Sequence, residues 1–356
     1  MTATPTKPIT AAHRPAPPAA PPGPPPAASM RLLEMLTAPW IAQAMYVVAR
    51  FDIADRLADG PRSAESLAAE TGLHADTLFR MLRTLASVGV FTETRPRHFG
   101  LGETGQYLRG DVQASQKYSA LLFGAETFRS WAEVLHTART GEPAFDKVFG
   151  RSFYSYLEDH SEASELFNRV MAVAGVVPPV TRAFDFTPHR HVVDVGGGSG
   201  AVIAAILAGN PEMRGTLVDL PEAVAGAEPA LSAAGVSDRC ARVAGSFFEP
   251  LPEGADLYLL SRVLHNWSDA DAVRILRNVR AAVPAHGRLL VCERFLPDGD
   301  EYHIGKVFDL VMLVMLGGRD RSAAEYRDLL GTAGFEVTGQ EPGPAGVGML
   351  VARPAG

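Results

Sequence analysis

The chain has 356 residues, 47% of them hydrophobic, a formal net charge of −7 at pH 7 and two cysteines. A chain of this length is expected to form more than one domain, and its acidic balance excludes the basic footprint of a nucleic-acid binder or of a protein held on an anionic membrane. Two cysteines are too few for a disulfide framework or a cysteine-based zinc site, so we expect a cytoplasmic protein without a metal that acts on small molecules.

The first 29 residues contain ten prolines and almost no large apolar side chains. Such a segment buries too little surface to offset the entropy of ordering, so residues 1–29 are predicted to form a disordered tail. Docking to a proline-recognising partner is the alternative. No uninterrupted apolar run approaches the roughly 18 residues of a membrane-spanning helix, and no signal peptide is apparent.

Residues 30–57 repeat apolar side chains at intervals of three and four residues, with an interruption at Pro39. This spacing predicts two helices with broad apolar faces. One subunit alone leaves such faces uncovered, so we expect them to pack against a second copy of the chain.

A helix, a turn, a second helix and a hairpin follow. Ser63 is a capping residue, Gly72 marks the turn, the second helix spans 77–87, and strands are expected around Phe91 and Phe99. This is the pattern of a winged helix, and we assign it with the preceding helices to residues 30–110.

A winged helix raises the alternative of a DNA-binding regulator. The second helix carries Arg80 and Arg83, but two arginines on one turn are ordinary on a solvated helix face. The other reading of this module is a dimerisation domain.

Residues 111–183 are predicted to be a helical connector that is rich in aromatic side chains, among them Trp131 and Phe167. Most of these rings are expected in the core. A cluster this dense beside a cofactor domain also suits a pocket for a flat ligand.

The stretch "HVVDVGGGSGAVIAAILAG", residues 191–209, predicts a buried strand, a glycine turn and a helix. Gly196, Gly198 and Ala201 satisfy the spacing of a dinucleotide-binding turn, and Asp219 lies at the distance of a ribose-binding acid. Asp194 favours a different ligand, because a pyrophosphate gains nothing from a carboxylate two residues before the first glycine. The ammonium group of an amino-acid-like cofactor gains an attraction from this carboxylate.

Strand-like runs recur after this turn and alternate with helices as far as residue 356. The last two, "FEVTGQEP" and "GVGMLVAR", read as an antiparallel pair that closes an otherwise parallel sheet. We therefore predict an α/β fold with a Rossmann-like class I methyltransferase sheet over 184–356, preceded by the mostly helical winged-helix domain.

From residue 30 to the C-terminus the chain resembles the S-adenosylmethionine-dependent O-methyltransferases of the plant caffeate and bacterial natural-product type. The resemblance rests on "DVGGGSG", "LVDLP" and "LSRVLHNWSD", which occur in the family's order. It implies a homodimer formed through the N-terminal domain and S-adenosylmethionine as cofactor. The family's Gly-Asp-aromatic-Phe segment reads "GSFF" here, so that Ser246 replaces the acid near adenine.

The resemblance also implies the roles of individual residues. His265 is the general base, Glu293 orients it, and Asp320 is a second acid in place of the usual Glu. The residues expected to contact the cofactor are Asp194, Gly196, Gly198, Asp219, Leu220, Ser246, Phe247, Ser261 and Arg262. Those expected to face the acceptor are Trp131, Phe167, Met171, Asp309 and Met312.

Together these features predict methyl transfer to a phenolic hydroxyl of an aromatic, polyketide-like natural product. A phenol is only about one part in a thousand ionised at neutral pH, so an imidazole that removes its proton creates the nucleophile. Two alternatives stay open, a family relative that has drifted to another reaction and the winged-helix regulator. The presence of His265 argues against drift.

Overall fold

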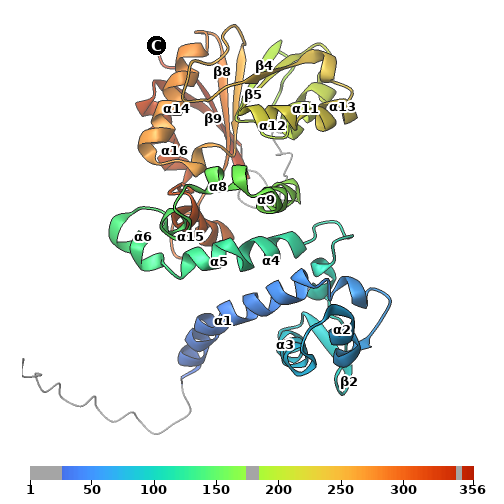
Figure 1. Cartoon of the computed structure of the whole chain (residues 1–356). Coiled ribbons are helices and arrows are strands. Elements are labelled where there is room, and N and C mark those ends of the chain that lie inside the picture. The colour runs from blue at the N-terminus through green and yellow to red at the C-terminus, as the bar shows by residue number, and fades with distance from the viewer. Residues whose placement is uncertain (1–25, 174–183, 342–346) are drawn as a thin grey trace, which may run out of the picture.

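The computed structural model describes residues 26–173, 184–341 and 347–356. They form three tiers: an N-terminal body, a layer of connecting helices, and a domain built on a large sheet (Figure 1). The predicted tail lies almost entirely outside the described residues.

The N-terminal body has the predicted order of helix, turn, helix and hairpin. The Oγ of Ser63 accepts the N–H of Ser66 at the start of α2, and Gly72 ends that helix in the left-handed region, with φ of 72°. The strands form a small sheet in the order β1-β3-β2. The elements are α1 (Ala27–Arg50), a 3-10 turn at Asp55–Leu57, β1 (Arg62–Ser63), α2 (Ala64–Thr71), α3 (Ala75–Ser87), β2 (Phe91–Arg95), β3 (His98–Leu101) and a 3-10 turn at Thr104–Leu108.

The prediction of two helices separated at Pro39 is wrong, because α1 continues through this proline. Proline removes the hydrogen bond to the carbonyl of residue 35 and crowds that carbonyl, which opposes a helix, but the helix continues on both sides of it. The hydroxyl of Thr37 donates to the carbonyls of Leu33 and Glu34, at 2.9 and 3.2 Å, one turn before the proline.

One face of α1 carries large apolar side chains into solvent. Leu36 is 65% exposed and Trp40 is 71% exposed. By length and composition, α1 also qualifies as a helix able to cross a membrane. The sequence prediction considered only uninterrupted apolar runs, and Arg31 and Glu34 interrupt this one.

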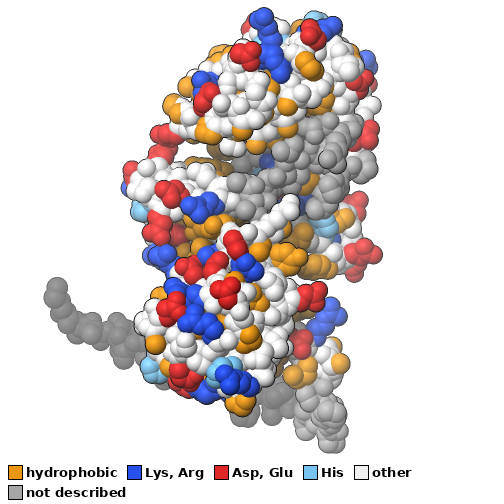
Figure 2. Space-filling model, turned by 90° about the vertical axis from the view of Figure 1, so that its right-hand side faces the viewer, with side chains coloured by type: hydrophobic (Ala, Val, Ile, Leu, Met, Phe, Trp, Pro, Cys, Tyr) orange, Lys and Arg blue, Asp and Glu red, His pale blue; other side chains and the backbone are white. Residues whose placement is uncertain are grey.

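The space-filling view places acidic and basic side chains side by side over the N-terminal body (Figure 2). The face shown there carries no broad basic patch of the kind that holds DNA. Hydrophobic side chains gather at the level of the connecting helices.

The described part of the connecting tier consists of short helices joined by turns. Phe145 is wholly buried, stacks on Phe149 with ring centroids 4.4 Å apart, and meets Phe153 and Tyr156 edge-on. Much of the aromatic cluster is therefore core. The helices are α4 (Lys117–Gly124), α5 (Glu126–Trp131), α6 (Val134–Thr140), α7 (Ala144–Phe149), α8 (Phe153–Asp159) and α9 (Ser161–Val173).

The sheet domain contains, within the described residues, a seven-stranded sheet in the order β6-β5-β4-β7-β8-β10-β9. β10 pairs antiparallel with both β8 and β9, and the other pairs are parallel, as predicted. The Pro-Gly turn expected between the last two strands lies outside the described residues. The strands are β4 (His191–Val195), β5 (Arg214–Asp219), β6 (Cys240–Ala244), β7 (Leu257–Ser261), β8 (Arg288–Arg294), β9 (Phe335–Glu341) and β10 (Val347–Pro354).

Helices cover both faces of this sheet. Val193 and Val195 pack into a core with α14 and α16 on one face, whereas Val192 packs with α11 and α13 on the other. The strand order reverses between β4 and β7, and the crevice outside their carboxyl ends is where such folds bind ligands. The helices are α11 (Ala201–Gly209), α12 (Pro221–Ala225), α13 (Glu228–Ala233), α14 (Asp269–Ala282), α15 (Ile304–Met315) and α16 (Ala323–Thr332), with 3-10 turns at Ser237–Arg239 and Leu264–Asn266.

Candidate active site

The loop between β4 and α11 is built on glycines in the left-handed region. Gly196, Gly198 and Gly200 have φ of 73°, 56° and 74°, which side chains with a Cβ rarely adopt. The Oδ2 of Asp219 accepts the N–H of Gly198 at 2.7 Å, and its Oδ1 accepts the N–H of Leu220 at 2.7 Å. The predicted ribose acid is therefore already oriented at the end of β5, with lone pairs left for a ligand.

Asp194 does not lie where we expected it. Its side chain is wholly buried, and a Cβ on Gly197 would lie 2.7 Å from its Cγ, so the carboxyl group sits beneath the loop. Asp194 shares the face of β4 with Val192, and strands alternate their side chains between faces. In this conformation the carboxyl group does not face the crevice, so the structure gives no support to its expected contact with a cofactor's ammonium group.

Burial raises the pKa of Asp194 to about 7, and the negative charge of Asp219 adds to this rise. The nearby amide of Ile203, at the start of α11, opposes it only in part. Among the described residues, neither carboxyl oxygen has a hydrogen-bond partner of good geometry. Asp194 is therefore a buried acid beneath the loop that keeps its proton up to about neutral pH.

The remaining residues expected to contact the cofactor lie around the same crevice. A Cβ on Gly196 would lie 2.9 Å from Cγ2 of Val263 and 3.4 Å from the ring of Phe247. Only a glycine therefore lets the loop approach these two side chains so closely. The Oγ of Ser246 accepts the N–H of Phe248 at 3.2 Å, which leaves its proton and a second lone pair available. Ser261 is the last residue of β7, Arg262 directly follows it with an unusual φ of 58°, and Leu220 directly follows β5.

His265 lies in the 3-10 turn just after β7 and is 7% exposed. Its Nδ1 is 2.8 Å from Oε2 of Glu293, and Oε1 of that acid accepts the N–H of Leu264 at 2.7 Å. Glu293 is wholly buried near the end of β8. Since an ionised carboxylate only accepts hydrogen bonds, Nδ1 carries the proton and Nε2 keeps its lone pair.

Asp320 lies close enough to His265 for their charges to interact. It is 4% exposed, and its Oδ2 is 3.6 Å from Nη1 of Arg294. Burial raises the pKa of Asp320, and the charges of His265 and Arg294 oppose the rise. The N–H of Asp320 donates to Oδ1 of Asp309 at 2.8 Å, and burial raises the pKa of Asp309 as well.

The residues expected to face the acceptor come from α5, α9 and α15. The structure brings Asp309 to Asp320, but Phe167 packs edge-on against Phe153 with centroids 5.3 Å apart, which makes it part of the aromatic core. Met171 is 39% exposed on α9. Trp131 and Met312 are half-buried at the end of α5 and on α15.

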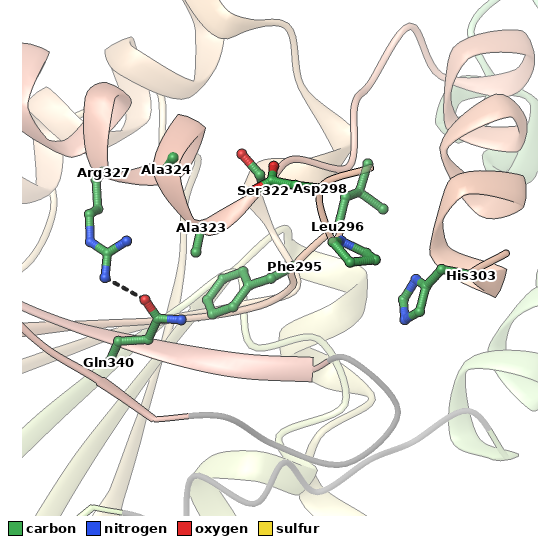
Figure 3. A pocket seen from close by; sticks show the side chains of 10 residues that line it. Phe295, Leu296, Asp298, His303, Ser322, Ala323, Ala324, Arg327 and Gln340 are labelled. Carbon is green, nitrogen blue, oxygen red and sulfur yellow. Dashed lines mark hydrogen bonds between the residues drawn. The ribbon is translucent and has the colours of Figure 1, made fainter. Parts of the chain in front are cut away.

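A separate cavity of about 430 Å³ lies beside the end of β8 (Figure 3). It is lined by Phe295, His303, the start of α16 and Gln340 of β9, which accepts a hydrogen bond from Arg327. Nothing in its lining comes from the glycine loop, so this cavity is distinct from the crevice. Among the described residues, no three His, Cys, Asp or Glu side chains are grouped to hold a metal ion.

Comparison with protein families gives two matches, one in the N-terminal body and one over most of the rest of the chain. Residues 131–336 match an O-methyltransferase domain, and residues 33–110 match an O-methyltransferase dimerisation domain. The chain belongs to the O-methyltransferase family. Its sheet is thus a class I methyltransferase sheet, and this methyltransferase uses S-adenosylmethionine.

Relatives of this methyltransferase act in natural-product biosynthesis. A phenazine O-methyltransferase of Lysobacter antibioticus is 45% identical over 91% of this chain and 95% of its own. The solved mitomycin 7-O-methyltransferase is 37% identical, with a TM-score of 0.87 over 92% of this chain and 98% of its own.

An O-methyltransferase from neocarzinostatin biosynthesis, solved with S-adenosylmethionine and 2-hydroxy-5-methyl naphthoic acid, is 35% identical. Its TM-score is 0.82 over 91% of this chain and 98% of its own. Two other relatives, 34% and 32% identical, are named as N-methyltransferases.

The sequence reasoning missed Tyr154 of this methyltransferase. It treated this ring as one more core aromatic, but the side chain lies close enough to Asp219 and Arg262 to interact with their charges. The residue is 38% exposed, and the surrounding protein together with the charge of Asp219 raises the pKa of its hydroxyl to about 12. Its place depends on how α8 folds over the sheet, for which the sequence carries no local signal.

Proposed function

We propose that this methyltransferase transfers a methyl group from S-adenosylmethionine to a phenolic hydroxyl of an aromatic natural product. The observation that carries the proposal is the buried pair of His265 and Glu293. The carboxylate fixes the imidazole by its Nδ1–H, and Nε2 is left as the proton acceptor. Relatives named for phenazine and naphthoate substrates support a flat aromatic acceptor.

The proposed reaction balances without a metal ion. S-adenosylmethionine, when bound, supplies a methyl group on a positively charged sulfur. His265 takes the phenol proton at Nε2, the phenol oxygen bonds to the methyl carbon, and the carbon–sulfur bond breaks. The products are a methyl ether, S-adenosylhomocysteine and a protonated imidazole, whose charge Glu293 and Asp320 offset before the proton leaves to solvent.

A base in this position favours oxygen over nitrogen as the acceptor atom. A phenol must lose its proton to become a strong nucleophile, whereas a neutral aromatic nitrogen attacks with a lone pair that it already has. Since some relatives are named as N-methyltransferases, the imidazole–carboxylate pair is the feature that supports O-methylation here.

The crevice supports roles for the residues around it. Asp219 has lone pairs for the ribose hydroxyls, Ser246 has a hydroxyl for the adenine end, and the loop glycines allow close approach of the backbone. Arg262 and Tyr154 would lie beside Asp219 at the cofactor. Asp309, Met312, Trp131 and Met171 would line the acceptor side, and Asp194 would support the loop from below.

We further propose a separate role for each of the three regions of the chain. Residues 30–110 would form a cytoplasmic homodimer, which their family match and the exposed face of α1 support. Residues 111–183 would shape the acceptor pocket, and residues 184–356 would bind the cofactor and catalyse transfer. The dimerisation match supports this role for the N-terminal domain over DNA binding.

His265→Ala tests the mechanism. Turnover on an ordinary phenol should fall about 100- to 10,000-fold, the usual contribution of a positioned general base. The dissociation constant for S-adenosylmethionine, measured by calorimetry, should stay near that of the parent. An acidic phenol that is already ionised at the assay pH should recover much of the rate, because its proton is gone.

The control is His286→Ala, which removes an exposed histidine after α14. It should leave both phenols at parent rates. Near-parent turnover of His265→Ala on the ordinary phenol, or loss of cofactor binding together with activity, would rule out the general-base role.

A further inference from the structure

Arg321 is 1% exposed, although it carries a charge that normally stays in water. Its side chain makes five hydrogen bonds, as many as a guanidinium has N–H groups. Nε and Nη2 donate to Oδ1 of Asp269 at 2.9 and 2.7 Å. The other three go to main-chain carbonyl oxygens.

Two of these carbonyls flank His265. Nη1 of Arg321 donates to the carbonyl of Leu264 at 3.1 Å, and Nη2 donates to that of Trp267 at 2.9 Å. Nη1 also donates to the carbonyl of Arg319 at 3.0 Å. The guanidinium therefore joins the turn that carries His265 to the segment that carries Asp320.

Further contacts hold this turn, from Glu293 on β8 and from the segment before Asp320. The carboxylate of Glu293 accepts a hydrogen bond from the N–H of Leu264, and the N–H of Arg319 donates to the carbonyl of His265 at 2.7 Å. A Cβ on Gly318 would come within 2.7 Å of the main chain of Asn266, so the segments are in close contact. The main chain at His265 has little freedom to move while these bonds persist.

We propose that Arg321 is a positioning residue that holds the imidazole of His265 in place for proton removal, an inference that rests on the general-base role proposed above. The carbonyl of Leu264 already accepts the N–H of Trp267 at 3.2 Å, so the guanidinium uses its second lone pair, and the carbonyl of Trp267 lies just after the turn. The planar fork of one guanidinium binds both carbonyls at once and fixes their separation. The ammonium group of a lysine is a compact charge that does not reproduce this geometry.

Arg321→Lys separates positioning from general stability. Turnover on an ordinary phenol should fall about 10- to 100-fold, since small displacements of a catalytic group cost that much. Turnover on an acidic, already ionised phenol should stay within about 3-fold of the parent, as should the dissociation constant for S-adenosylmethionine, because neither depends on a base at Nε2.

Arg239→Lys is the matched control. This arginine also donates to main-chain carbonyls, those of Leu207, Asn210 and Met213, at 2.8 to 3.1 Å, but far from the histidine turn. It should lower the midpoint of thermal unfolding, as Arg321→Lys does, and leave the ratio of the two phenol rates unchanged.

A second measurement does not need turnover. In cofactor-free protein labelled with ¹⁵N-histidine, the His265 signal, identified by its absence in His265→Ala, should report the Nδ1–H tautomer. Arg321→Lys should shift it toward a mixture of tautomers. If Arg321→Lys does not fold, Asp269→Asn replaces it, because it weakens two of the five bonds at a carboxylate that is 54% exposed. The same change in rate ratio is then expected, at about 3- to 10-fold.

The outcomes distinguish the two proposals. Equal losses on both phenols, or no loss, overturn the positioning role of Arg321 when His265→Ala in the same series still shows a selective loss. If His265→Ala itself shows no selective loss, the general-base proposal fails first.

Discussion

Asp194 is an acid held in the protein interior at a cost in stability. Its folded-state pKa of about 7 lies above the ordinary 3.8, so the native chain keeps a proton that the unfolded chain releases between about pH 4 and pH 7. The unfolded state then binds fewer protons, and the free energy of unfolding falls as pH rises through this window. Above about pH 7, the free energy of unfolding no longer changes through this group.

Asp194→Asn should remove this dependence, because an amide resembles the neutral acid and does not titrate. The variant should gain stability over the parent between about pH 4 and pH 7, by up to about 4 kcal/mol. Urea unfolding across this pH range measures it, with Asp328→Asn, an exposed acid on α16, as the control. Parallel curves for parent and Asp194→Asn would contradict the assignment.

The residue scale is also where sequence reasoning fell short. The glycine pattern and Asp219 were recognisable because they are local. The alternation of β4 places Asp194 on the side of Val192, facing α11, which the motif alone did not reveal. Arg321 carried no signal for this role, since its carbonyl partners in the histidine turn lie 57 and 54 residues away in the chain.

At the scale of elements, the loop from β4 to α11 is braced by β5. Asp219 holds Gly198 and Leu220 through their N–H groups, and it keeps lone pairs for a ribose. Asp219→Ala should therefore weaken S-adenosylmethionine binding by roughly 1.5 to 3 kcal/mol, the range for hydrogen bonds to a charged group.

Calorimetry on the purified enzyme measures this loss. Asp238→Ala, which removes an exposed acid before β6, should leave the dissociation constant unchanged. An unchanged constant for Asp219→Ala would mean that this residue is not the ribose acid.

Elements with local signals were predictable, and those that depend on their surroundings were not. The Ser63 cap, the Gly72 turn and the parallel strands follow from side-chain preferences within a few residues. Pro39 was read as a break because proline opposes helices in general. The helix nevertheless continues through this residue, and side-chain preferences within a few residues do not predict that.

At the scale of the whole molecule, α1 leaves an apolar face in solvent that one subunit does not cover. Within a homodimer, a buried tryptophan commonly supplies a large share of the association energy, and burial of a leucine removes further apolar area from water. Replacing Leu36 and Trp40 by Glu should weaken self-association by at least about 2 kcal/mol, or roughly 30-fold in the dissociation constant.

Sedimentation of the variant and the parent over a range of concentrations checks this prediction. Tyr302→Glu, at an 82% exposed position in the sheet domain, is the control and should behave as the parent. An unchanged assembly state for the Leu36/Trp40 variant would place the interface elsewhere.

The hydrogen bond from the N–H of Asp320 to the carboxylate of Asp309 has an evolutionary consequence. On the roles proposed above, α15 would line the acceptor side, and Asp309 of this helix also holds the backbone of Asp320. A substitution in α15 that admits a bulkier ring would then also alter the catalytic rate. Evolution toward such an acceptor is expected to go through a slower enzyme, until a second substitution restores the rate.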